Sequence, residues 1–150
     1  MSQIYISQAL RKETIAYFKR RCAYCRSPEE LVWVFYEVDH IIPVAQGGPT
    51  IKENLALTCA ICNRFKSDIT HGTDPSTGRR TALYHPRRQN WFRHFAWSSD
   101  NLVIYGRTVC GRATVEAIQL NNARLIGLRK IWLRLGALPP NWNYVTEESE

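Results

Sequence analysis

The pairs Cys22-Ala23-Tyr24-Cys25 and Cys59-Ala60-Ile61-Cys62 decide the fold of this 150-residue chain. Two cysteines with two residues between them place both thiolates on one side of a tight turn, and two such turns complete a tetrahedral zinc shell. One pair alone is also typical of a redox motif, but a pair of pairs favours zinc. Because four protein ligands leave no position for a substrate, we expect a structural zinc ion that holds the fold together.

The segment between the two pairs predicts two strands joined by a loop. Residues 31–38 are apolar, aromatic and β-branched, which indicates a buried strand, and Pro43 with the turn at 46–49 ends it. Residues 55–57 predict a short return strand, and residues 59–67 predict a helix. The order strand, loop, strand, helix, with a zinc clamp at its base, predicts an α+β fold.

The stretch Val38-Asp39-His40-Ile41-Ile42-Pro43 sets a carboxylate beside an imidazole at the end of the first strand. It opens the series "DHIIPVAQGG", "ENLALTC" and "CNRFK", which in this order resembles the HNH endonuclease family, whose core is a ββα-metal finger. The resemblance covers residues 22–67, less than a third of the chain. It implies a site formed by Asp39, His40, Asn54 and Asn63, and the same Asp, His and Asn set is similar to the HNH domain of CRISPR effector nucleases.

The resemblance implies a role for each of these residues in phosphodiester hydrolysis. An imidazole changes charge near neutral pH, so His40 is expected to be the general base that takes a proton from water. Asp39 and Asn63 are expected to hold one Mg²⁺ or Mn²⁺ by oxygen, and Asn54 to close the loop that carries the base. Ser67 stands where the bacterial-toxin branch of the family has a further histidine, which favours a hard cation over catalytic zinc. Neighbouring strand residues point to opposite faces, so Asp39 and His40 are expected to serve one phosphate only if the strand bends.

The charge of the chain predicts a polyanionic partner. Lys and Arg number 20 against 13 Asp and Glu, which gives a net charge of +7, and the excess concentrates in residues 63–134. An arginine-rich face exposed to solvent is an equally simple explanation of this excess. If the partner is DNA, the expected phosphate contacts come from these six side chains: Arg64, Lys66, Arg79, Arg80, Arg87 and Arg88.

The rest of the chain predicts one element before the zinc finger and three after it. Ser7 is expected to cap a helix that ends near Arg20. After the finger we expect a loop to Arg88, a hairpin with strands at 91–97 and 102–105, and a helix from about Ala113 that breaks at 121–122 and restarts. The expected parts are therefore an N-terminal element (1–21), the HNH finger (22–70), a basic and aromatic extension (71–142) and an acidic tail (143–150), joined in one compact unit. Cys110 is expected to be a buried small apolar residue.

Taken together, the sequence predicts a metal-dependent HNH endonuclease that hydrolyses DNA, with a nicking or restriction-like action. The alternative is a zinc-stapled nucleic-acid-binding module without activity, and a protein-interaction zinc domain is a third class that the arginine excess disfavours. No apolar run is long enough to span a bilayer and the N-terminus lacks the apolar core of a signal peptide, so a cytoplasmic protein without a membrane partner is expected. The oligomeric state is left open, and double-strand cleavage would require a dimer.

Overall fold

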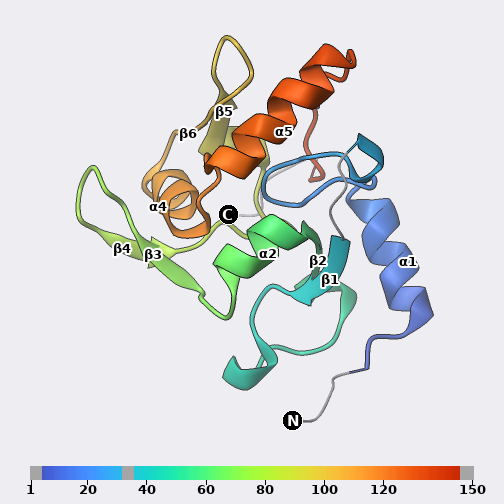
Figure 1. Cartoon of the computed structure of the whole chain (residues 1–150). Helices are drawn as coiled ribbons and strands as arrows, with labels where there is room; N and C mark the ends of the chain where they lie inside the picture. Colours follow the sequence, from blue (N-terminus) through green and yellow to red (C-terminus); the bar gives the residue numbers. More distant parts are fainter. Residues whose placement is uncertain (1–4, 32–35, 146–150) are drawn as a thin grey trace.

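The computed structural model describes residues 5–31 and 36–145 of the chain. Three two-stranded antiparallel sheets and five α-helices make up most of this part (Figure 1). The elements are α1 (Gln8–Tyr17), β1 (Tyr36–His40), β2 (Leu55–Cys59), α2 (Ala60–Lys66), β3 (His71–Thr73), β4 (Arg80–Ala82), α3 (Trp91–His94), β5 (Phe95–Trp97), β6 (Ile104–Gly106), α4 (Val109–Ile118) and α5 (Ala123–Arg134). The mixed α+β class predicted from the sequence is confirmed.

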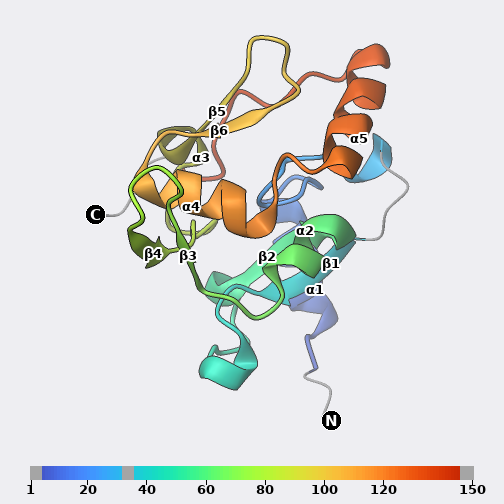
Figure 2. The ribbon, with the colours of Figure 1, turned by 60° about the vertical axis from the view of Figure 1, so that its left-hand side comes forward.

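The β1–β2 hairpin lies between α1 and α2 and forms the middle of the N-terminal half (Figures 1 and 2). Its register pairs Tyr36 with Cys59 and His40 with Leu55, so β2 delivers Cys59 directly to the start of α2. All five residues of β2 are buried, because both helices cover this strand. The predicted first strand, residues 31–38, begins too early: the described strand runs from Tyr36 to His40, and residues 32–35 lie outside the described part.

One cluster of buried side chains joins the two halves of the chain. It contains Phe18 from α1 and Tyr24 from the first cysteine pair together with Trp91, Phe95 and Leu125 from the C-terminal half. The indole Nε1 of Trp91 also donates a hydrogen bond of 2.9 Å to the carbonyl oxygen of Tyr24. The extension therefore packs directly on the zinc finger.

Three elements of the C-terminal half differ from the prediction. Residues 91–94 form the short helix α3 and only Phe95–Trp97 is extended, because an apolar run does not by its pattern distinguish a strand from a helix. The predicted loop before Arg88 contains the hairpin β3–β4, whose turn is held by Asp74 and its salt bridge of 2.9 Å to Arg112. Helix α4 begins at Val109 rather than near Ala113, since the hydroxyl of Thr108 caps it.

The predicted cap of α1 agrees with the structure, and a second cap that was not predicted begins α5. Ser7 accepts a hydrogen bond from the backbone N–H of Leu10, and Asn122 accepts one from Leu125, so α5 restarts where the sequence places it. Helix α1 ends at Tyr17, short of Arg20, because Lys19 and Arg20 adopt positive φ angles of 53° and 58°. Within the described ranges, no helix combines the length and the apolar character that crossing a bilayer requires.

Candidate functional site

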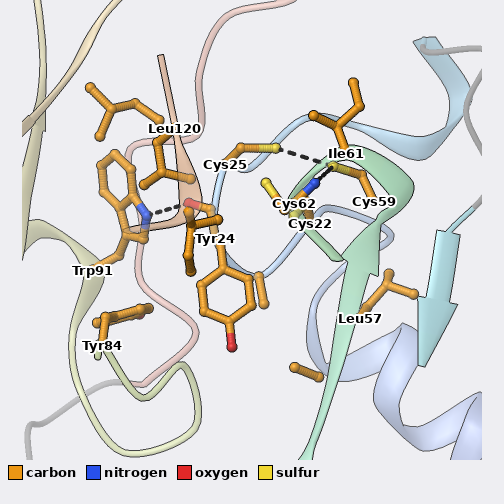
Figure 3. Close-up of a cluster of buried hydrophobic side chains, with 14 of the residues drawn as sticks. Cys22, Tyr24, Cys25, Leu57, Cys59, Ile61, Cys62, Tyr84, Trp91 and Leu120 are labelled. Carbon is orange, nitrogen blue, oxygen red and sulfur yellow. Dashed lines mark hydrogen bonds between the residues drawn. The ribbon is translucent and has the colours of Figure 1, made fainter. Parts of the chain in front are cut away.

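The four paired cysteines form one buried cluster (Figure 3). The sulfur atoms of Cys22, Cys25, Cys59 and Cys62 all lie within 4.8 Å of one another, and those of Cys25 and Cys59 are 3.7 Å apart. A tetrahedral zinc ion with Zn–S bonds of about 2.3 Å would hold neighbouring sulfurs about 3.8 Å apart. The donor set and its spacing therefore fit a closed zinc site, as the sequence predicts.

Backbone hydrogen bonds hold both cysteine turns in place. The backbone N–H of Arg26 donates to the carbonyl of Cys22 at 3.0 Å and closes the first turn. In the second turn the N–H of Cys62 donates to the Cys59 sulfur at 3.4 Å. Hydrogen bonds with Cys22 and Cys25 raise the pKa of Cys59 and Cys62 well above the ordinary value, so these thiols have to release protons when a metal binds. Cys110 lies on α4, half-buried and outside this cluster.

Strand β1 presents one face to helix α2, and this face carries two carboxylates. Side chains two apart on a strand share a face, so Glu37 and Asp39 both point toward the helix. The amide nitrogen of Asn63 on α2 donates to the Glu37 carboxylate at 2.8 Å. One turn further along α2, the buried Lys66 donates to the carbonyl of His40 at 3.4 Å. Burial lowers the pKa of Lys66, and the nearby Asp39 carboxylate opposes this shift. Glu37 and Asp39 thus lie on the side of β1 that faces Asn63, as a cation site formed by Asp39 and Asn63 would require.

His40 lies on the opposite face of β1. Its ring nitrogen Nε2 is 2.9 Å from the hydroxyl of Thr50, in the loop that follows the strand. The register stays regular through the last pair, His40 with Leu55, so no bulge interrupts β1 between Asp39 and His40. Both residues nevertheless stand at the end of β1, where the chain leaves the hairpin.

Asn54 closes the loop between the two strands. Its side-chain oxygen accepts from the N–H of Ile42 at 2.9 Å, and its nitrogen donates to the carbonyls of Ile42 and Pro49 at 3.0 and 2.9 Å. Gly48 lies against the same contact, since a Cβ there would meet the Ile42 oxygen at 1.7 Å. Asn54 is only 5% exposed, so it is a scaffold that fixes the chain directly after His40 and cannot reach a substrate.

We expect Asn54→Ala to destabilise the protein by about 2–4 kcal/mol, because three hydrogen bonds at a buried position are lost and their partners stay unpaired. Urea unfolding followed by circular dichroism measures this change. Asn63→Ala is the matched control: its amide makes one exposed contact, so its cost should stay below about 1 kcal/mol. Equal costs for the two variants would contradict the scaffold role of Asn54.

The basic side chains predicted to contact DNA divide into two groups. Arg64, Arg79, Arg80 and Arg88 are exposed. Arg87 is not available: its guanidinium forms two hydrogen bonds with the Glu13 carboxylate at 3.1 and 2.9 Å and one with the carbonyl of Leu55. The prediction that Lys66 contacts DNA is also wrong, because this side chain is only 2% exposed and its ammonium donates to the carbonyl of His40.

Sequence reasoning missed two residues of the site, Glu37 and Thr50. The position of Glu37, two residues before Asp39 on a strand, was the signal that could have placed it on the same face. Thr50 carries no such signal, because its contact with His40 depends on how the loop folds back.

Residues 22–68 match the family model of the HNH endonuclease. The matched segment begins at the first zinc ligand and contains β1, β2, α2 and all four site residues expected from the resemblance. This segment is therefore an HNH domain, a kind of domain typical of nucleases. No curated protein and no solved structure matches the chain.

Proposed function

We propose that this protein is a metal-dependent DNA endonuclease that hydrolyses one strand of its substrate. One observation carries the proposal: the HNH match falls on the segment in which Asp39 lies on the side of β1 that faces Asn63, and His40 ends the same strand. The charge of +7 and the exposed arginines supply the attraction to a polyanion. A single site of this kind cuts one strand, so double-strand cleavage would require two copies.

The oxygen atoms of Asp39 and Asn63 suit a hard divalent cation. Asp39 supplies a carboxylate and Asn63 an amide oxygen, both of which suit Mg²⁺ or Mn²⁺. Because the Asn63 nitrogen donates to Glu37, its oxygen stays free to face the cation. When bound, the cation would neutralise charge on the phosphate and stabilise the 3′ leaving oxygen. Lys66 would share the Asp39 carboxylate with it and add a second positive charge beneath the strand end.

His40 would act as the general base. The bond between Thr50 and Nε2 fixes the ring, and Asn54 fixes the chain behind it. Since Asp39 and His40 point to opposite faces, the scissile phosphate has to sit beyond the end of β1, where a group can contact both faces at once. The family's chemistry then gives products with 5′-phosphate and 3′-hydroxyl ends.

The direct test is incubation of supercoiled plasmid with Mg²⁺, Mn²⁺, Ni²⁺ or Zn²⁺. We expect nicked circles with Mg²⁺ or Mn²⁺ and none after chelation of the loosely bound metal. Asp39→Ala should slow nicking by about 100-fold or more, because charge stabilisation at the phosphate is lost. Asp68→Ala, at an exposed carboxylate just after α2, is the control and should nick at the parent rate. Parent activity in the Asp39 variant would remove this residue from the site.

Two observations favour the second candidate, an inactive zinc-stapled nucleic-acid-binding module. The Lys66 ammonium lies near Asp39, where a cation would bind, and His40 contacts Thr50 on the opposite face of β1. This candidate predicts that the protein shifts DNA in a gel while leaving plasmid intact with every metal tested. Nicking that disappears in the Asp39 variant would exclude it.

A further inference from the structure

A cavity of about 440 Å³ opens between the HNH domain and the extension. Ile41, Ile42 and Lys66 line it from the HNH side, and the segment from Thr81 to Gln89 lines it from the other. Its size falls within the usual range of pockets that take one small organic group. The cavity begins directly after His40, because Ile41 and Ile42 are the next two residues of the chain.

The cavity also adjoins Asp39. Ile41, two residues after Asp39 in the chain, lines the cavity, and so does Lys66 of α2. Lys66 itself bridges the two places, since its ammonium contacts the His40 carbonyl and faces the cavity. A group bound in the cavity would therefore lie next to the end of β1.

Three polar side chains of the lining offer donors: His85, Gln89 and Lys66. The Nδ1 atom of His85 accepts from the N–H of Arg87 at 3.3 Å, so its proton sits on Nε2. Burial, aided by the positive charge of Arg88, lowers the pKa of His85 to about 4, which keeps the ring neutral. The side-chain oxygen of Gln89 accepts from the N–H of His85 at 2.8 Å, which leaves its NH₂ group for a ligand. Lys66 adds a charged donor.

Aliphatic side chains form part of the remaining wall beside Thr70, His71 and Thr81, and an arginine stands at the edge of the cavity. Ile41, Ile42 and Leu83 supply flat aliphatic contacts that suit the faces of a planar ring. Arg88 is exposed at the edge of the cavity, where it can meet a backbone phosphate. This lining matches a nucleobase that remains attached to its strand: aliphatic side chains would pack on the ring, the donors would meet its polar edge, and Arg88 would meet the backbone phosphate.

We propose that this cavity takes an unstacked nucleobase of the DNA strand, next to the scissile phosphate, and that it prefers guanine and thymine. Both bases present carbonyl oxygens to donors, whereas adenine and cytosine present an amino group at the same edge. This proposal rests on the proposed function and adds to it that the substrate is a strand with one base turned out of the stack.

Titration with free nucleotides tests the cavity without any cleavage. Deoxyguanosine and thymidine 5′-monophosphates should shift the NMR signals of the Ile41, Ile42 and Leu83 methyl groups. Their dissociation constants should be at least about fivefold lower than those of the adenine and cytosine nucleotides, which corresponds to one good hydrogen bond. Deoxyribose 5-phosphate, which has no base, should leave these signals in place. Equal shifts with the bare sugar phosphate would overturn the proposal.

A matched pair of variants gives a second readout. Ala82 is exposed at the rim of the cavity on β4, so Ala82→Trp should block the cavity without disturbing the core and abolish nucleotide binding. Ala9→Trp, at an exposed position of α1 on the other side of the molecule, should bind as the parent does (Figure 1). Unchanged nucleotide binding in the Ala82 variant would also overturn the proposal.

Oligonucleotide cleavage separates this proposal from the function on which it rests. Removing single bases along the substrate should slow cutting by the parent protein at one position beside the cut, and Ala82→Trp should lose this dependence. If the parent cuts DNA but no abasic position matters, the cavity proposal is wrong and the nuclease proposal stands. If the parent cuts no DNA at all, the nuclease proposal is wrong, and the nucleotide titration alone decides whether the cavity takes a base.

Discussion

Cys59→Ser should leave the protein without zinc and largely unfolded at room temperature. The reason is the size of the metal contribution: binding at a structural zinc site is worth about 10–16 kcal/mol, whereas a whole domain is stable by only about 5–15 kcal/mol. The four cysteines are fully buried and belong to the cluster that also contains Trp91 and Leu125. Loss of the metal should therefore unfold the extension together with the finger.

Metal content and unfolding are measured together for this variant. The parent should contain one zinc ion per chain and show a cooperative thermal transition by circular dichroism, and a strong chelator should abolish both. Cys110→Ser is the matched control, because Cys110 is half-buried and lies outside the four-cysteine cluster. We expect it to retain its zinc and to lose about 1 kcal/mol or less. A Cys59 variant with full zinc content and an unchanged transition would show that these thiols do not hold the metal.

The features that the sequence predicted correctly are those set by short-range chemistry. The two cysteine pairs come together because each pair makes a tight turn and their four sulfur atoms suit one zinc ion. Ser7 caps α1 because its side-chain oxygen satisfies a backbone N–H three residues away. Each of these depends on a few neighbouring residues, so the pattern alone is sufficient.

The features that the sequence missed depend on contacts between distant segments. Arg87 stands among arginines and aromatic residues, which is typical of a nucleic-acid surface, but Glu13 from α1 takes its guanidinium. Arg26 is fully buried, with its guanidinium over the rings of Trp91 and Tyr144 at 4.8 and 4.6 Å. Nothing near these arginines in the sequence distinguishes them from Arg79 or Arg80, which are exposed. The identity of a basic side chain predicted its charge but not whether that charge faces DNA.

The candidate site also combines features that the sequence predicts with features that depend on the whole fold. The regular pairing of His40 with Leu55 is a property of the whole hairpin, so the sequence could state that a bend was needed but not whether it forms. Because the pairing is regular there, Asp39 and His40 lie on opposite sides of the end of the strand, the first facing Asn63 and the second Thr50. The geometry thus makes a demand on the substrate: the phosphate has to lie across the end of β1, close to the opening of the cavity that follows Ile41.

His40→Ala should reduce plasmid nicking by about 10²–10⁴-fold, the usual contribution of a general base. DNA binding should stay within about twofold of the parent, since His40 contributes no charge to the exposed basic surface. The fold should also be retained, because the side chain makes one hydrogen bond, with Thr50, at a half-buried position. Nicking rates under saturating Mg²⁺ or Mn²⁺, gel-shift affinities and the thermal transition measure these three quantities on the same preparations.

Two further variants identify what His40 does. Thr50→Val removes the contact that fixes the ring and should slow nicking less than His40→Ala does, with little change in DNA affinity. His71→Ala changes an exposed histidine of β3 and should nick at the parent rate. Full activity in the His40 variant would remove the general base from the proposed mechanism. If the Asp39 and His40 variants both lose nicking but keep DNA binding, both residues act on one phosphate. Because they lie on opposite faces of β1, that phosphate has to bind at the end of the strand.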